Sequence, residues 1–451
     1  MNKSTWLKRA VSLTLTSALT LALASCQSEN VNTEPNLNND EISALSRKKD
    51  GQKKWTFMVH LAADNNLYPF GLEDINEMEA GLKNLRGNDV NVVVLFDGTQ
   101  KGDSAVYEIK ADPAGMNKEI ISPKVDNPVA AAGSEIDSGN KELAGKFLDW
   151  ATTTYPADHY AYVVWNHGAG WQREGKGKNG QILKPIKNAT SYSSAGELIT
   201  KEFAWDDNGG HMSTVDLNGI LDPVAKKIGR KLDVLDFDAC LMAHVEVAYQ
   251  MRNSVDYLVA SEKTEPGAGN PYGDIFSSLG KNPSMSGKEF ASAIVKDYGK
   301  SYTNGSQGTS SVTLSATSTE KLVSDLVPAI NSFAGSMTSS LDKDKVALME
   351  NRNKTTNYEN GDCKDLGHFA KLVSADARVS ADVKDKANGV LTALKSAVVE
   401  EFHSGKTSKA VADSTGLVMY MPGKGQAVNS RYAKLDFASE KWDEFLQAFV
   451  K

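Results

Sequence analysis

Apolar runs of strand length alternate, from residue 55 to residue 264, with segments that have a helical pattern. Five runs rich in β-branched and aromatic residues predict strands: 55–64, 89–98, 159–168, 232–240 and 254–264. Four segments between or after them predict helices: 66–86, 141–155, 214–228 and 241–252. Strands that alternate with helices build parallel sheets covered on both faces. The pattern therefore predicts an α/β fold with a mostly parallel central sheet.

The chain beyond residue 285 differs, because helical patterns dominate there. Four further segments predict helices: 287–304, 318–340, 379–403 and 441–451. The polar residues 341–360 predict a loop, and 414–422 predicts a late strand. We therefore expect a sheet-containing domain over 53–340. A smaller, mostly helical C-terminal region over 341–451 is expected to return one strand to the sheet.

Three of the predicted strands end on polar or reactive side chains: Asp97, His167 and Cys240. The carboxyl ends of parallel strands meet at one edge of a sheet, where open α/β folds build their sites. His167 and Cys240 are far apart in the chain, yet this geometry predicts that both open into a common cleft at that edge.

Cys240 and His167 carry side chains suited to nucleophilic catalysis. A thiol at the start of a helix feels the positive end of the helix dipole, which favours the thiolate. An imidazole can protonate a leaving amine near neutral pH. The N–H groups of Gly168 and Cys240 are candidates for stabilising an oxyanion. For each residue taken alone, a structural role stays open: a buried cysteine, or a hydrogen-bonded histidine at a strand end.

Asp238 precedes Cys240 by two residues, so in an extended strand both side chains lie on one face. Its carboxylate could receive a substrate Lys or Arg, or it could make only structural hydrogen bonds at the strand end. The polar loop 172–189 follows His167 and contains five basic residues: Arg173, Lys176, Lys178, Lys184 and Lys187. A peptidase that prefers basic residues would cut its own chain there, because exposed loops are preferred cleavage sites.

Metal binding is a weaker interpretation of the same region. Cys240, His244 and His211 offer soft ligands, but no C-x-x-C or H-E-x-x-H pattern is present, so zinc is not expected. The turn WDDNGG (205–210) offers oxygen ligands for Ca²⁺ but lacks the later acidic position of a complete EF-hand loop. We expect no required metal or cofactor and leave Ca²⁺ binding open.

Residues 1–25 predict a targeting segment that is not part of the fold. Three basic residues flank the start of an apolar stretch over 10–25, and LASC (23–26) resembles the cleavage box of bacterial lipoproteins. By that resemblance Cys26 becomes the lipidated first residue, with an ordinary signal peptide as the alternative. Residues 26–52 are polar and predict a flexible tether. We expect an exported protein, anchored by lipid in the bacterial cell envelope.

Composition narrows the classes of function. The net charge is −7, and no basic stripe is present, which argues against nucleic-acid binding. Only Cys240 and Cys363 follow residue 26, too few for a disulfide scaffold, although one bridge between them is open. No stretch after residue 25 approaches the roughly 20 apolar residues that a membrane-spanning helix needs.

Four motifs resemble, in order, the clostripain family of cysteine peptidases: FMVHLAADNNL, NHGAGW, DFDACLMAHVEVAY and ASEKTEPGAGNPY. The resemblance runs from about residue 54 to about residue 280 and returns at STGLVMYMP. It implies a caspase-like α/β/α sandwich with His167 and Cys240 as a catalytic dyad. It also implies cleavage after Arg or Lys, with Asp238 in the pocket for that side chain. Activation by a cut between the two catalytic positions would match loop 172–189, and some members depend on calcium.

One position departs from the family pattern. Ala268 stands where relatives can carry a second acidic pocket residue, which leaves Asp238 as the only negative group assigned to the pocket. A small or neutral residue before the cut therefore stays open. We expect a monomeric, lipid-anchored cysteine endopeptidase that acts on peptide or protein substrates. The rival from another class is a catalytically silent binding lipoprotein with the same fold.

Overall fold

The computed structural model describes residues 52–85, 89–131, 133–171, 203–359, 361–405 and 408–451. Residues 51–451 form one unit, which holds all the elements named below. The predicted signal peptide, Cys26, the tether and loop 172–189 with its five basic residues lie outside the described residues. Among the described helices, none combines the length and the apolar character that crossing a membrane requires.

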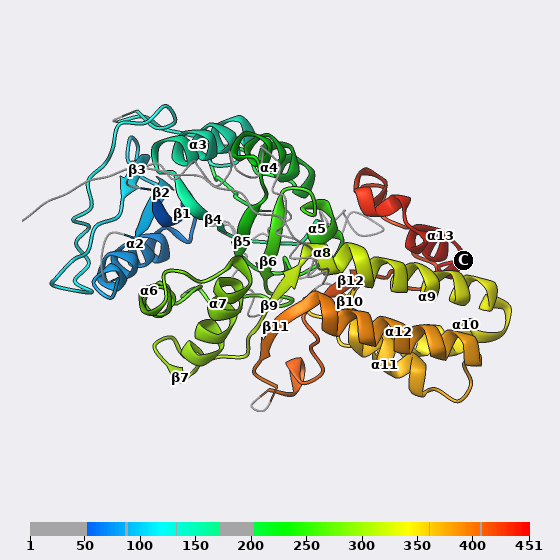
Figure 1. Ribbon diagram of the computed structural model, residues 1–451. Helices are drawn as coiled ribbons and strands as arrows, with labels where there is room; N and C mark the ends of the chain where they lie inside the picture. Colours follow the sequence, from blue (N-terminus) through cyan, green and yellow to red (C-terminus); the bar gives the residue numbers. More distant parts are fainter. Residues whose placement is uncertain (1–51, 86–88, 132, 172–202, 360, 406–407) are drawn as a thin grey trace, which may run out of the picture. The chain divides into compact units, whose positions relative to one another are not determined.

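An eight-stranded sheet forms the centre of the unit, in the order β11-β9-β6-β5-β4-β1-β2-β3 (Figure 1). Its strands are β1 (Lys53–Ala62), β2 (Val90–Asp97), β3 (Ala105–Glu108), β4 (Ala157–Trp165), β5 (Leu232–Asp238), β6 (Val255–Ala260), β9 (Thr313–Ser318) and β11 (Val398–His403). The five strands from β6 to β2 are parallel, and the antiparallel strands β3, β9 and β11 lie toward the two edges. The predicted mostly parallel sheet is confirmed.

Helices cover both faces of the sheet, which explains why its strands read as nearly continuous apolar runs. Phe57 and Met58 are neighbours on β1, and each belongs to a different hydrophobic layer because successive side chains point to opposite faces of the sheet. One layer contains α3 (Lys141–Thr154), α4 (Thr214–Ile228) and α5 (Val245–Gln250). The other contains α2 (Tyr68–Leu82), α6 (Tyr272–Lys281) and α7 (Gly287–Ser301). Figure 1 shows α3 and α4 opposite α2, α6 and α7, so the fold is the predicted α/β/α sandwich.

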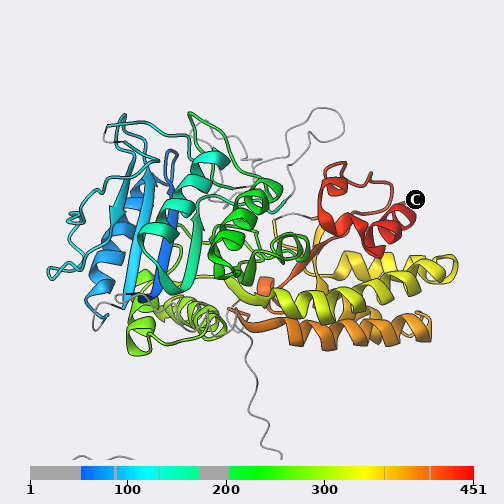
Figure 2. The ribbon, with the colours of Figure 1, turned by 45° about the horizontal axis from the view of Figure 1, so that its top comes forward.

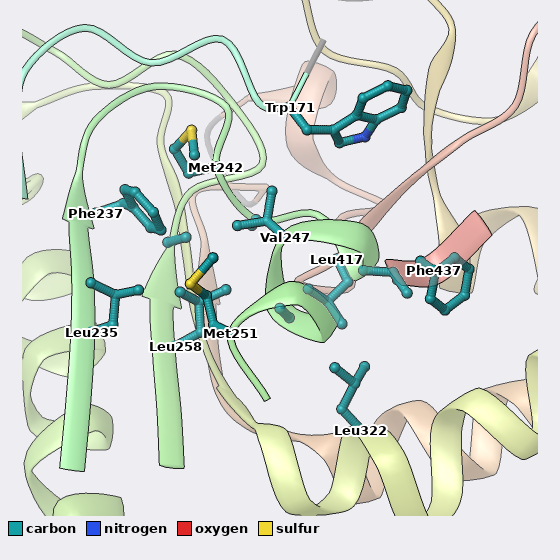
Figure 3. Close-up of a cluster of buried hydrophobic side chains, with 14 of the residues drawn as sticks. Trp171, Leu235, Phe237, Met242, Val247, Met251, Leu258, Leu322, Leu417 and Phe437 are labelled. Atoms are coloured by element: carbon teal, nitrogen blue, oxygen red, sulfur yellow. The ribbon is translucent and has the colours of Figure 1, made fainter. Parts of the chain in front are cut away.

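Five helices form most of the C-terminal part: α9 (Val327–Ser339), α10 (Leu341–Lys354), α11 (Leu366–Ala375), α12 (Ala381–Ala397) and α13 (Lys441–Phe449). Figure 2 shows them gathered beside the sandwich. The two parts share one hydrophobic cluster, which runs from Leu235 and Leu258 on the strands through Val247 of α5 to Leu417 and Phe437 (Figure 3). The boundary expected at residue 340 stays a prediction, and the hydrophobic core crosses it.

Residues 341–360 were expected to form a loop, but most of them form helix α10, so this prediction is wrong. The helix turns only a narrow apolar face toward the core. Ala347 and Leu348 are buried there, whereas Val346 is exposed. A helix with so few apolar positions gives little periodic signal in the sequence.

The helix predicted over 379–403 ends at Ala397, and the chain continues as the edge strand β11. Val399 and Phe402 pack against the hydrophobic layer around α7, so burial at the sheet edge overrides the helical pattern. The strand predicted over 414–422 is β12 (Val418–Tyr420), which pairs with β10 (Cys363–Asp365) in a separate two-stranded sheet. The strand that the C-terminal region returns to the main sheet is therefore β11.

The C-terminal helix α13 is expected to support the fold through Trp442. This ring is fully buried, and its Nε1 donates a hydrogen bond to the Tyr420 carbonyl at 2.9 Å. Trp442→Ala should lower the free energy of unfolding by about 3–5 kcal/mol because it empties a large buried site. Val346→Ala changes a side chain that is 70% exposed, and it should cost less than about 0.5 kcal/mol. Urea unfolding followed by circular dichroism checks both; equal effects would contradict the role of Trp442.

Candidate active site

The ends of β4 and β5 bring His167 and Cys240 together. These strands are parallel neighbours, and Trp165 on β4 pairs with Asp238 on β5. His167 and Cys240 each lie two residues beyond this pair, so both leave the sheet at the same edge. A single pocket is lined by His167, Cys240, Asp238 and Glu265, among others.

Gly168 lets the two strand ends approach at backbone distance. A Cβ atom at this position would lie 2.1 Å from the carbonyl oxygen of Cys240 and 3.0 Å from its nitrogen. Gly170 has a φ of +66°, and a Cβ atom there would meet the His244 ring at 2.6 Å. Side chains do not tolerate such contacts, so the Gly-Ala-Gly sequence after the histidine is required by packing.

His167 is 2% exposed, and its ring contacts Asn66 and Trp205. Its Nε2 donates a hydrogen bond to Asn66 Oδ1 at 2.9 Å, and its centroid lies 5.8 Å from the Trp205 ring. The preceding residue, Asn166, donates from Nδ2 to the carbonyl oxygens of Ala62 and Trp205. Burial lowers the pKa of His167 to about 4. The ring is therefore neutral at pH 7, and Nδ1 carries its lone pair.

Cys240 is 5% exposed, and its thiol contacts the backbone of Glu265. The Glu265 N–H donates a hydrogen bond to Sγ at 3.3 Å. The thiol in turn donates to the Glu265 carbonyl oxygen, which lies 4.0 Å from Sγ. The loop that follows β6 therefore supplies direct polar neighbours of the sulfur, although it lies 25 residues farther along the chain.

Cys240 does not stand at a helix N-terminus, contrary to the prediction of a helix over 241–252. Helix α5 begins only at Val245 and has six residues. Leu241 takes a φ of +62°, and its N–H donates to the Lys263 carbonyl at 3.1 Å. The chain after the cysteine first pairs with the loop beyond β6, so the dipole of α5 does not begin at the thiol.

Asp238 lines the pocket beside Cys240. Its carboxylate accepts hydrogen bonds from the Tyr272 hydroxyl at 2.8 Å and the Asn270 N–H at 3.2 Å. It also shares a hydrogen bond with the Glu265 carboxyl. Burial raises the pKa of Asp238 to about 6, and burial together with Asp238 raises the pKa of Glu265 well above its usual range. The two acids therefore hold a proton between them.

Two more buried acids lie close to this pair. Trp165 Nε1 donates to Asp74 at 2.6 Å, and Asn270 Nδ2 donates to Asp236 at 2.8 Å. Burial, followed by the charge of Asp238, raises the pKa of both acids. Within the described ranges, Asp74, Asp236 and Asp238 form no salt bridge with a Lys or Arg side chain.

The sequence left Asp238 as the only acid assigned to the pocket, because Ala268 is not acidic. The structure adds Glu265, which lies three residues before Ala268. Glu265 lines the pocket and contacts both Asp238 and Cys240. The motif TEPGAG contains this residue. Nothing in the motif indicates that the loop after β6 folds back toward Cys240 at the end of β5.

The pocket has little free space. Its cavity measures about 30 Å³, and a single water needs at least about 10–15 Å³ by the same kind of measure. A lysine or arginine side chain does not fit unless the lining residues move. Leu67 and the segment Glu265–Gly267 form part of this lining, and a Cβ atom at Gly267 would meet the Phe70 ring at 2.7 Å.

The other candidate ligands do not gather around a metal. His244 is buried before α5, with Nδ1 3.8 Å from Glu246 Oε2. In the part of the chain that the structure describes, no group of three or more His, Cys, Asp or Glu side chains is arranged to hold a metal ion. Ca²⁺ binding stays a prediction. Cys240 and Cys363 are not joined by a disulfide.

Gly168→Ala is expected to disrupt the strand ends, because the new Cβ atom would collide with the Cys240 carbonyl. We expect the free energy of unfolding to fall by about 3 kcal/mol, the upper end of the usual cost of overpacking. Gly219→Ala is the matched control: it lies in α4, and a Cβ atom there meets nothing within 4 Å. That change should stabilise the helix by about 0.5–1 kcal/mol. Urea denaturation of both variants measures these changes. A Gly168→Ala variant as stable as the wild type would contradict the close contact between the backbones of Gly168 and Cys240.

Burial of His167 predicts a pH-dependent contribution to stability. Because the folded pKa of about 4 lies below the usual 6.5, the unfolded chain binds the extra proton between these values. The contribution is complete above pH 6.5 and is lost as the pH falls toward 4, by roughly 3 kcal/mol. We expect the stability difference between the wild type and His167→Gln to shrink by that amount from pH 7 to pH 4 in urea unfolding. A difference independent of pH would show that the ring is not buried in its neutral form.

Solved structures that share this fold include two C11 cysteine proteases. A secreted C11 cysteine protease from Bacteroides thetaiotaomicron, in complex with an irreversible peptide inhibitor, is 21% identical with a TM-score of 0.61, over 87% of this chain and 99% of that one. An inactive zymogen of a C11 protease from Parabacteroides distasonis is 17% identical with a TM-score of 0.57, over 88% of this chain and 98% of that one. At these identities the likeness concerns the fold.

Sequence comparison identifies the family. Clostripain from Hathewaya histolytica is 29% identical over 259 residues, which cover 52% of this chain and 44% of that protein. The match therefore spans less than half of that relative's length. The profile of the clostripain family, Peptidase_C11, matches residues 59–449, which is most of the chain. The resemblance expected from the four motifs is confirmed, and the chain belongs to the clostripain family.

Proposed function

We propose that this protein is a cysteine endopeptidase in which Cys240 and His167 are the catalytic residues. The observation that carries the proposal is the register of β4 and β5, at whose ends a thiol and an imidazole line one acidic pocket. Membership in the clostripain family supports the reaction type, and the two solved structures compared above are C11 cysteine proteases.

The proposed reaction passes through an acyl-enzyme. The Cys240 thiol gives its proton to His167, and the sulfur attacks the carbonyl carbon of the substrate. The N–H groups of Gly168 and Cys240 are candidates to stabilise the oxyanion, a contribution of roughly 3–4 kcal/mol per good donor. The imidazolium then protonates the departing amine, and water hydrolyses the thioester with the imidazole as base.

The residue before the cut is proposed to be Lys or Arg. Asp238 and Glu265 line the pocket, and a cationic side chain would form charge-assisted hydrogen bonds with them. The small cavity favours the alternative, a small or neutral residue, unless the pocket opens. Substrate profiling separates these two specificities.

We extend the proposal to segments outside the described residues. The targeting pattern of 1–25 and LASC support export and a lipid anchor at Cys26, and the Bacteroides relative is described as secreted. The basic loop 172–189 supports activation by cleavage, and the Parabacteroides relative is an inactive zymogen. Adding a chelator to the peptide-hydrolysis assay tests whether the enzyme requires Ca²⁺.

Cys240→Ala and His167→Ala are each expected to lower peptide hydrolysis by at least about 10³-fold, because each removes a group that acts in the chemical step. Cys363→Ala removes the other buried thiol and should leave the cleavage pattern unchanged. The measurement is mass-spectrometric profiling of the full chain on a peptide library. Identical cleavage by wild type and Cys240→Ala would end the peptidase proposal. Cleavage after Ala or Ser alone would end only the specificity.

A further inference from the structure

Glu265 contacts both the sulfur and the acidic pocket. Its backbone N–H donates to Cys240 Sγ at 3.3 Å, and its carbonyl oxygen lies 4.0 Å from the same atom. Its carboxyl shares a hydrogen bond with the Asp238 carboxyl. A displacement of this one residue therefore changes the surroundings of the sulfur and of the pocket at the same time.

The loop that carries Glu265 is fixed on either side of it. Before it, the Thr264 hydroxyl donates to Glu359 at 2.9 Å. After it, Gln307 Nε2 donates to the Ala268 carbonyl at 3.1 Å, and the Tyr302 hydroxyl donates to the Gly269 carbonyl at 2.9 Å. The short segment 265–267 spans these anchors and lines the cavity of about 30 Å³, so it is the part of the loop whose movement would enlarge the pocket.

We propose that Glu265 is a positioning residue that couples occupation of the pocket to the nucleophile: a cationic side chain engages the Asp238–Glu265 pair, draws Glu265 away from Cys240 and releases the sulfur for attack. This inference rests on the proposed function, which supplies the cationic substrate. It adds that the substrate itself converts the closed pocket into the reactive one.

The charges support this coupling. A guanidinium or ammonium group favours two ionised carboxylates, so the proton held by the pair leaves to bulk water. The positive charge then lies beside Cys240 and favours its thiolate. The charge of Asp238 or Glu265 raises the pKa of six nearby acidic groups: Asp74, Glu77, Asp236, Tyr272, Tyr298 and Tyr302. None of these six supplies a positive charge in place of the substrate.

Alkylation of the thiol tests the coupling without peptide hydrolysis. Iodoacetamide forms a carbon–sulfur bond and releases iodide, and peptide mapping of the full chain reports Cys240 and Cys363 separately. Methylguanidine is the cationic probe, and N-methylurea is its neutral counterpart. We expect methylguanidine to accelerate alkylation of Cys240 by about tenfold through thiolate formation and release of the sulfur. N-methylurea should change this rate by less than about twofold, and the Cys363 rate should respond to neither compound.

Variants assign the effect to Glu265. Glu265→Gln preserves the size of the side chain but removes its charge, so we expect the response to methylguanidine to fall below about twofold. Glu359→Gln is the matched control: it changes an acid bonded to the same loop outside the pocket lining and should keep the tenfold response. In the wild type, methylguanidine should also lower the pH of half-maximal alkylation by about one. A purely structural role of Glu265 would not produce that shift.

Equal responses to the cationic and the neutral probe, or equal responses of wild type and Glu265→Gln, would overturn the coupling. If Glu265→Gln does not fold by circular dichroism, Asp238→Asn removes the other half of the pair and decides by the same criterion. Cleavage after Lys or Arg that depends on Cys240 would still stand after such a result, because it is measured on peptides. Failure of the inference and failure of the proposed function are therefore distinguishable.

Discussion

The backbone contact between Gly168 and Cys240 is the constraint on which the site depends. Ladder hydrogen bonds fix the register of β4 and β5, but they stop before either reactive residue. Beyond them, the Asn166 N–H donates to the Asp238 carbonyl at 3.2 Å, and the missing side chain at Gly168 lets the two segments stay in contact. The relative position of the thiol and the imidazole therefore follows from the sheet register and from the absence of a Cβ atom at Gly168. It does not require a direct bond between the two side chains.

The acidic pocket shows how a binding site and folding stability depend on the same groups. Carboxylates buried close together repel each other and lose hydration, so isolated ionised forms are unfavourable. In this structure the raised pKa values of Asp238 and Glu265 mean that protons compensate for the missing positive charge. A cationic ligand can replace those protons, whereas a neutral ligand cannot. Without a ligand, the fold thus tolerates a cluster of protonated acids. The positive charge that would balance the ionised cluster has to come from a ligand.

Much of the sandwich could be predicted from the sequence, because its central strands are buried on both faces and read as continuous apolar runs. The start of α4 also carries a local signal in the sequence, because Ser213 and Asp216 form a capping box. Helix α10 was missed because most of its surface is polar. Strand β11 was missed because its conformation is set by packing at the sheet edge and not by its own pattern.

The site was predictable where chain position alone sets it, as for His167 and Cys240 at the ends of parallel strands. The environment of the thiol was not. Leu241 takes a left-handed conformation and pairs with the loop beyond β6, which delays α5 and brings Glu265 to the sulfur. Both features depend on contacts between segments that lie more than 20 residues apart, and no local spacing encodes them.

The place of β11 also has a consequence for the order of assembly. This strand forms one border of the main sheet, and it pairs with β9, which lies about 80 positions earlier in the chain. The chain must therefore be available through His403 before β9 receives its outer neighbour. Until then the outer side of β9 offers unpaired peptide groups, a surface prone to wrong pairing in a crowded compartment. Chaperone protection during biogenesis would matter most for that late interval.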